Sequence, residues 1–82
     1  MGCLIVFRSV TYAQNGLNHL NRNHIGAVLT RPPAGRGKNG CSYGLKVREP
    51  DLSRALEVLT RAGVPWSGAF CQKGTGWQEV PR

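Results

Sequence analysis

The sequence predicts an α+β, ferredoxin-like βαββαβ fold: a four-stranded antiparallel sheet in the order 4-1-3-2, with two helices on one face. Three observations predict it. Four apolar runs and two segments of helical periodicity follow one another as strand, helix, strand, strand, helix, strand. Glycine and proline mark the boundaries between them. The 82 residues allow one small domain, predicted over residues 1–71 and followed by a loose tail over 72–82.

The first strand is predicted over residues 3–8, because residues 4–7 form a continuous apolar run typical of a buried central strand. Ser9 is then the predicted N-cap of a helix over about residues 10–23, with Thr11 as the alternative cap. Asparagine and glycine lower the propensity of this helix, so we expect packing against the sheet to hold it. Its buried face is predicted from the spacing i, i+4, i+7 and i+11, which selects Ala13, Leu17, Leu20 and His24.

Three more strands are predicted over residues 25–30, 44–48 and 66–71. Residues 31–40 contain two prolines and three glycines, which preclude regular structure through most of this stretch. In the third strand, apolar and basic residues alternate. This predicts a buried face and an exposed basic face, with Leu45 and Val47 on the first and Lys46 and Arg48 on the second.

The second helix is predicted to begin at Pro50, which suits a first helical turn. Gly63 is the expected left-handed residue after its end, and Pro65 prevents continuation. Its apolar stripe follows helical spacing and consists of Leu52, Ala55, Leu56, Leu59 and Ala62.

The three cysteines are the candidate reactive groups. If the first and third strands run parallel, Cys3, Cys41 and Cys71 meet at one end of the sheet, beside the basic loop. Both helices are then expected to finish at this end, where their negative dipole ends disfavour thiolates. The loop cations that offset this effect and form the predicted anion-binding group are Arg31, Arg36 and Lys38.

Two alternatives for the cysteines stay open. Cys3 and Cys71, in strands, also suit the role of small buried hydrophobic residues. No two cysteines have C-x-x-C spacing and neither histidine lies near one, so we expect no metal site, with a three-thiolate cluster as the remaining possibility.

The net charge of +7 favours anionic partners. No apolar segment has the length of a membrane span, and no secretory signal is recognisable, so we expect a cytoplasmic protein with reduced thiols and no membrane partner. Nucleic acid is one candidate partner. The interleaved aromatic and basic strand motif of RNA-recognition modules is absent from residues 44–48, although Trp66 and Phe70 are possible substitutes.

Several segments together resemble the putative selenium/sulfur carrier protein-like family, a small bacterial family. The resemblance covers roughly residues 3–70 and is carried by residues 4–9, 30–32, 44–47, 51–52 and 62–64. In that family the cysteine directly precedes the glycine–leucine pair. Tyr43 holds this position here, and Cys41 lies two residues earlier.

The resemblance implies a carrier of sulfur or selenium. Cys41 is then the acceptor thiol of a persulfide or selenosulfide, and Cys71 or Cys3 is the resolving thiol. The implied partners are a sulfur or selenium donor enzyme and an acceptor enzyme, with no cofactor and no catalytic turnover. Two alternatives remain: a basic module for nucleic acid or acidic proteins with structural cysteines, and a homodimer formed through the open sheet face.

Overall fold

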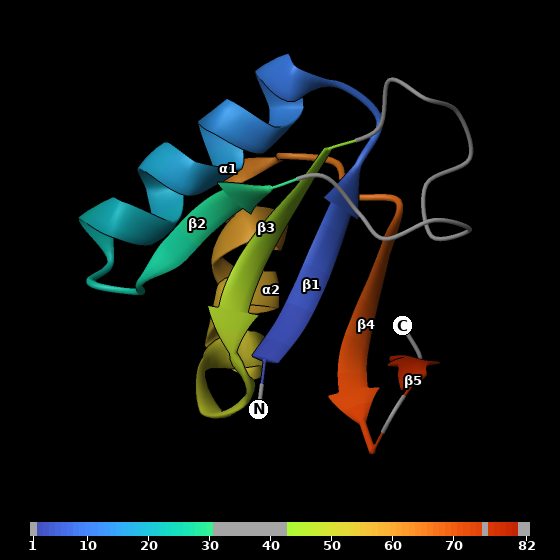
Figure 1. The fold of residues 1–82 in the computed structure, drawn as a ribbon. Helices are drawn as coiled ribbons and strands as arrows, with labels where there is room; N and C mark the ends of the chain where they lie inside the picture. Colours follow the sequence, from blue (N-terminus) through green and yellow to red (C-terminus); the bar gives the residue numbers. More distant parts are fainter. Residues whose placement is uncertain (1, 31–42, 75, 81–82) are drawn as a thin grey trace.

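The computed structural model of the 82-residue chain describes residues 2–30, 43–74 and 76–80. The α+β class is confirmed (Figure 1). The elements in chain order are β1 (Gly2–Phe7), α1 (Val10–Arg22), β2 (Ala27–Thr30), β3 (Tyr43–Arg48), a 3-10 turn η1 (Glu49–Asp51), α2 (Leu52–Ala62), β4 (Gly68–Lys73) and β5 (Gly76–Glu79).

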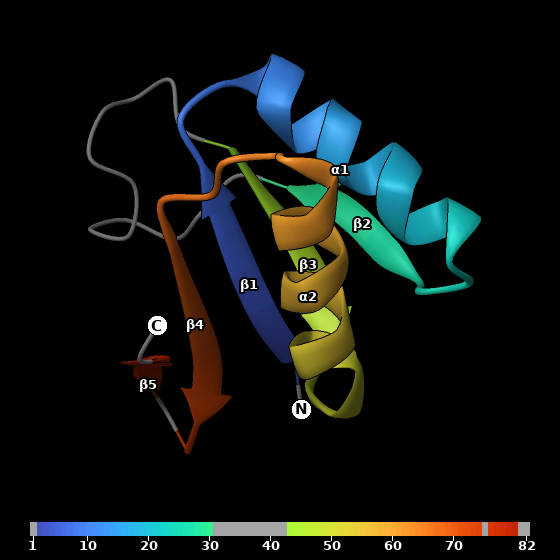
Figure 2. The same ribbon diagram turned by 180° about the vertical axis from the view of Figure 1, so that it is seen from behind.

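The strands of the described residues form one antiparallel sheet in the order β2-β3-β1-β4-β5. This order contains the predicted 4-1-3-2 arrangement, read in reverse. The predicted number of four strands is wrong, because β5 adds a fifth strand along the outer edge of β4. Both helices cover the same face of the sheet (Figure 2).

The fifth strand lies in the stretch that the sequence predicts to be a loose tail. Gly74, at a φ of 57°, makes the turn out of β4, a backbone conformation that glycine adopts readily. Trp77 of β5 then pairs with Gln72, and the Val80 amide donates to the Ala69 carbonyl at 2.8 Å. Val80 also packs against the core, so apolar burial as well as strand pairing holds this segment.

The direction of β3 corrects the expectation that it runs parallel to β1. The two strands are antiparallel, with Cys3 opposite Val47 and Phe7 opposite Tyr43. The physical reason is the connectivity: β1 and β2 point the same way across the α1 crossover, and β3 pairs antiparallel with β2. The start of β3 therefore lies at the end of the sheet opposite Cys3.

Helix α1 begins as predicted, because the Ser9 side chain accepts a hydrogen bond from the Tyr12 amide at 3.3 Å. Its buried face differs from the prediction at the C-terminal end. His24 lies beyond the helix, exposed and at a φ of 60°, because the chain turns there to enter β2. Gly16 is buried on this helix instead.

Gly16 allows α1 to approach the sheet closely. A Cβ atom at this position would lie 3.0 Å from Leu59 Cδ2, 3.1 Å from Phe7 Cζ and 3.2 Å from Leu45 Cδ1. All three neighbours are fully buried, so they have little room to move. Close packing of α1 against the sheet therefore favours the glycine that weakens the helix in isolation.

We expect Gly16→Val to lower the free energy of unfolding by about 2 kcal/mol, because the added atoms overpack the core. Urea denaturation of the oxidised protein measures the change. The matched control is Asn18→Val, which places the same side chain at an exposed position of α1 and should change stability by less than about 0.5 kcal/mol. Equal losses in the two variants would contradict the close-packing explanation.

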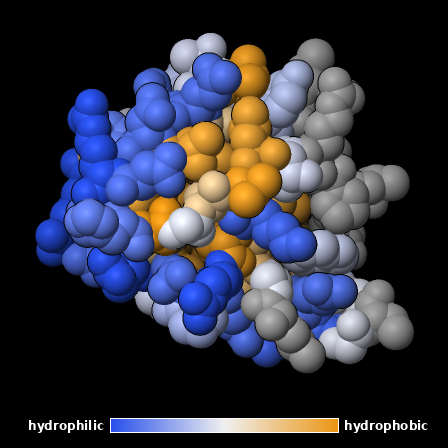
Figure 3. Space-filling model, turned by 60° about the vertical axis from the view of Figure 1, so that its left-hand side comes forward, coloured by the Kyte–Doolittle hydropathy of each residue, from blue (hydrophilic) through white to orange (hydrophobic). Residues whose placement is uncertain are grey.

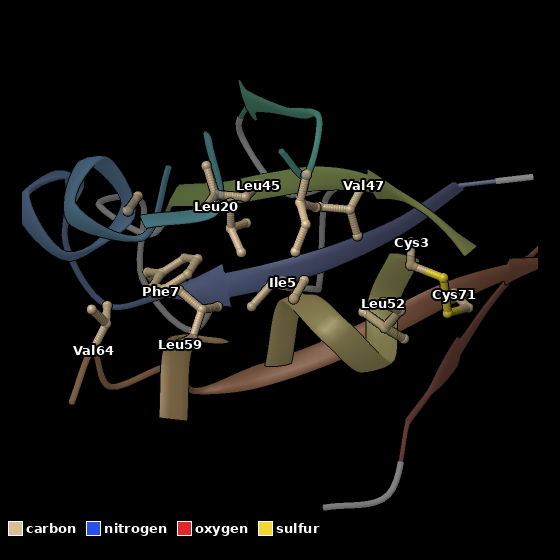
Figure 4. Packing of buried hydrophobic residues seen from close by; sticks show 13 residues of the cluster. Cys3, Ile5, Phe7, Leu20, Leu45, Val47, Leu52, Leu59, Val64 and Cys71 are labelled. Atoms are coloured by element: carbon tan, nitrogen blue, oxygen red, sulfur yellow. A yellow bond between two sulfur atoms is a disulfide. The ribbon is translucent and has the colours of Figure 1, made fainter. Parts of the chain in front are cut away.

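Helix α2 ends as the sequence predicts. Gly63 is left-handed at a φ of 74°, the Gly63 amide donates to the Thr60 carbonyl, and the Val64 amide donates to the Leu59 carbonyl. The core lies between the helices and the sheet (Figure 4). It is built from buried residues of β1, α1, β3, α2 and β4, with Ile25 and Val64 from the connections: Cys3, Ile5, Phe7, Ala13, Leu20, Ile25, Leu45, Val47, Leu52, Ala55, Leu59, Val64 and Cys71.

The opposite face of the sheet carries no helix of the described residues. The alternation predicted for β3 is confirmed, since Leu45 and Val47 are buried while Lys46 and Arg48 are exposed. Figure 3, seen from the side of α1 and β2, shows hydrophobic residues gathered among hydrophilic ones. On the edge strand β2, Val28 is 64% exposed. Neither helix of the described residues is long and apolar enough to cross a membrane.

Candidate dithiol–disulfide site

Cys3 and Cys71 form a disulfide between β1 and β4 (Figure 4). They are directly opposite one another in the antiparallel ladder, with Cα atoms 4.0 Å apart. The two side chains point to the helix-covered face, where Cys3 is 0% and Cys71 6% exposed. The expectation of reduced thiols thus differs from the structure. The two strand cysteines do lie in the apolar core, as one alternative proposed, but they are bonded to one another.

The disulfide lies beside η1, the segment that connects β3 to α2. Arg48, the last residue of β3, pairs with Gly2, so the next residue, Glu49, emerges beside the start of β1. The ligand-type atoms of Cys3, Glu49 and Cys71 all lie within 4.8 Å of one another. Lys73 of β4 reaches the same carboxylate, with Nζ 3.6 Å from Glu49 Oε2. The bonded cysteines therefore have an exposed ion pair at their border.

The helix directions at this site also correct the sequence expectation. Only α1 finishes at the Cys3 end of the sheet, while η1 and α2 begin there, because β3 runs antiparallel to β1. A helix start carries partial positive charge, which favours nearby anions. The helix ends thus oppose thiolates less than the parallel arrangement implied, whereas the nearby Glu49 carboxylate and the burial of both sulfurs oppose them.

The structure places only part of the predicted site. Cys3 and Cys71 come together as predicted. Cys41, the predicted acceptor thiol, and Arg31, Arg36 and Lys38, the predicted anion-binding residues, lie outside the described residues. The reasoning that gathered Cys41 with the other two cysteines required parallel β1 and β3, and that premise is wrong.

Glu49 is the residue that sequence reasoning missed at this site. The available signal was its position between the end of a strand and Pro50, at the start of a helix. With the strand directions drawn as antiparallel, this junction falls beside the start of β1. The error in direction therefore hid both the carboxylate and the helix start.

A family model described as "Putative Se/S carrier protein-like" matches residues 2–71. This chain belongs to that family. The match includes all three cysteines and ends within β4, so β5 lies outside it. No curated protein and no solved structure gave a significant match. The resemblance seen in the sequence is therefore confirmed at the level of the family.

Proposed function

We propose that this chain carries sulfur or selenium on a cysteine, as a persulfide or a selenosulfide. The observation that carries the proposal is the Cys3–Cys71 disulfide, within the part of the chain that the family model matches. Such a bond is the product that remains when a carrier with two neighbouring thiols releases its cargo. The family description supports the nature of that cargo.

The proposed carrier works in two steps, loading and release. In loading, a carrier thiolate attacks the outer sulfur of a donor persulfide; the new S–S bond forms on the carrier, and the donor leaves as a thiol. In release, a second carrier thiol attacks the inner sulfur, a carrier disulfide forms, and hydrogen sulfide leaves. For selenium, the loaded group is R–S–SeH and the leaving product is hydrogen selenide. A dithiol reductant then restores both thiols and is itself oxidised to a disulfide.

Two cysteines are candidates for the acceptor. The sequence proposes Cys41, with Arg31, Arg36 and Lys38 attracting the anionic cargo. We propose Cys71 as the second candidate, with Cys3 as its resolving thiol; the proximity of the two cysteines in the disulfide supports this pairing. Both are close to a strand end, Cys3 at the second position of β1 and Cys71 at the fourth of six in β4. Strand ends open locally more easily than strand centres, which gives a donor access to buried sulfur atoms.

The proposed setting is the cytoplasm, with a cysteine desulfurase-type donor enzyme and a sulfur- or selenium-using acceptor enzyme. In most cytosolic proteins a disulfide is transient and serves catalysis or redox sensing. A working Cys3–Cys71 pair fits this setting better than a permanent structural bond does.

Mass spectrometry of the reduced protein, treated with a cysteine desulfurase and cysteine, tests the proposal. We expect the wild-type chain to gain the mass of one sulfur atom and to release sulfide over time. If Cys41 is the acceptor, Cys41→Ala abolishes the gain. If Cys71 is the acceptor, Cys3→Ala retains the added sulfur on Cys71 for longer, because the resolving thiol is missing.

Peptide mapping of the loaded protein identifies the modified cysteine directly. The triple variant Cys3→Ala/Cys41→Ala/Cys71→Ala is the blank for sulfur bound non-covalently. A wild-type chain that gains no sulfur, while a known persulfide acceptor in the same mixture does, would overturn the carrier function.

A second candidate function rests on the exposed basic face of β3. Lys46 and Arg48 are exposed and alternate with the buried Leu45 and Val47, so they lie on the face of β3 opposite the helices, which suits nucleic acid or an acidic protein. A binder of this kind retains polyanions when all three cysteines are replaced, and its affinity falls steeply with salt concentration. The cysteine-free variant used above therefore separates the two functions.

A further inference from the structure

Three side chains with metal-binding atoms meet at the end of the sheet, each from a different element. Cys3 comes from β1, Glu49 from η1 and Cys71 from β4, and their ligand atoms all lie within 4.8 Å of one another. We propose that the reduced form of this cluster, the Cys3–Glu49–Cys71 site, binds a thiophilic divalent cation such as Zn²⁺. The site goes beyond sulfur carriage, because it requires no donor or acceptor protein.

The set of donor atoms is one that zinc uses in proteins. Two cysteine sulfurs bind at about 2.3 Å and a carboxylate oxygen at about 2.0–2.2 Å, in tetrahedral geometry. These bond lengths place the two sulfurs roughly 3.8 Å apart and each sulfur about 3.5 Å from the oxygen. Because the three ligand atoms already lie within 4.8 Å, small side-chain movements close the site once the S–S bond is reduced. Three protein ligands leave the fourth position for water or another donor.

The pairing of β1 with β4 keeps the two sulfur atoms close together in the reduced protein as well. Cys3 and Cys71 are opposite one another on hydrogen-bonded strands and lie against the core, so reduction alone does not separate them. Glu49 connects the buried sulfurs to solvent, since its side chain is 44% exposed. A cation therefore enters past the carboxylate and meets the buried sulfurs behind it.

Within the protein, Lys73 competes with the metal ion for the Glu49 carboxylate. Its Nζ lies 3.6 Å from Glu49 Oε2, but the two side chains are 58% and 44% exposed. An ion pair so open to water is weak, so a divalent cation displaces the lysine easily. Removing the lysine should consequently strengthen metal binding.

Reduction of the disulfide frees both sulfurs to bind the metal. A phosphine or dithiol reductant breaks the Cys3–Cys71 bond, supplies two electrons and yields two thiols. Zn²⁺ then binds both sulfurs as thiolates, and two protons leave to solvent. The same sulfur atoms make the disulfide and the metal bonds, so the two states exclude one another. The proposed site is thus filled only under reducing conditions.

The test uses the full chain carrying Cys41→Ala, so that Cys3 and Cys71 supply the only sulfur ligands from cysteine. Zn²⁺ is titrated anaerobically against a chromophoric chelator, after reduction with a phosphine and again after oxidation. We expect one Zn²⁺ per reduced chain and none per oxidised chain. Co²⁺ in place of Zn²⁺ should give the near-ultraviolet sulfur-to-metal charge-transfer absorption of thiolate ligation.

Matched variants test each part of the site. Glu49→Gln should weaken Zn²⁺ binding at least tenfold, as expected for loss of a ligand. Glu57→Gln makes the same change on α2, where Glu57 pairs with Arg61, and should leave the affinity unchanged. Lys73→Gln should raise the affinity. Both glutamates are exposed, so neither variant is expected to unfold the chain.

Three results would overturn the proposal: no Zn²⁺ on the reduced chain, equal binding by the oxidised chain, or undiminished affinity in Glu49→Gln. Because no sulfur transfer is measured, failure here leaves the proposed carrier function untouched. Conversely, a chain that accepts no sulfur from the donor can still bind one Zn²⁺ in its reduced form.

Discussion

Reduction of the Cys3–Cys71 disulfide is expected to lower the free energy of unfolding by about 4 kcal/mol. The bond joins residues 68 positions apart, so it closes most of the chain into one loop. In the chain-entropy account, breaking a link across a loop of this length stabilises the unfolded state by about 4 kcal/mol. A chain of 82 residues has a total stability on the order of 4–12 kcal/mol, so the loss is a large part of it.

Urea denaturation with and without a phosphine reductant measures this change. The double variant Cys3→Ala/Cys71→Ala lacks the bond and should unfold at the same urea concentration in both buffers. Cys41→Ala keeps the bond and should respond to reductant as the wild-type chain does. A loss below about 1 kcal/mol on reduction would contradict the prediction and show that the antiparallel ladder alone holds β1 and β4 together.

This prediction links stability to the proposed function. If the reduced pair loads and releases sulfur, the loaded protein is also the less stable one. Opening of the sheet at Cys3 and Cys71 becomes easier in that state, which is when a partner needs access. The oxidised protein, once its cargo has left, regains the covalent link.

Leu59→Ala is expected to cost about 3 kcal/mol of stability in the oxidised protein. Leu59 is fully buried on α2 and faces Gly16 of α1. Truncation removes apolar contacts and leaves a cavity between the two helices and the sheet, a change that typically costs 2–5 kcal/mol. Urea denaturation measures it.

The control for Leu59→Ala is Thr60→Ala, on the same helix but exposed. The Thr60 hydroxyl donates to the Leu56 carbonyl within the helix, so its loss should change stability by only about 0.5 kcal/mol. Gly16→Ala, introduced together with Leu59→Ala, provides a second check. Its Cβ then enters the space left by Leu59 Cδ2, so the two changes together should cost less than the sum of the single changes.

The glycine at position 16 shows where sequence reasoning stops. Read alone, it is a residue that weakens a helix by about 1 kcal/mol relative to alanine. In the folded protein it leaves room for Leu59, Phe7 and Leu45, which are distant in the sequence and pack against position 16 only after folding. No local pattern signals such a contact.

The fifth strand was hidden for a related reason. Residues 76–79 have little apolar content apart from Trp77, they begin with Gly76, and Pro81 follows shortly after them. An isolated segment of this kind has no reason to be a strand. It becomes one because the outer edge of β4 offers unpaired backbone groups, and Val80 finds apolar surface against the core.

The sequence by itself determined the local elements and the family. A continuous apolar run predicted β1, and apolar periodicity predicted β3 and α2. Ser9 and Gly63 marked helix ends. These signals are local, because runs, periodicity and caps depend on neighbours only a few positions away. Only the tertiary structure decided strand direction, and with it which cysteines meet. Cys3, Glu49 and Cys71 are far apart along the chain, and their proximity depends on the antiparallel pairing of β1 with both β3 and β4.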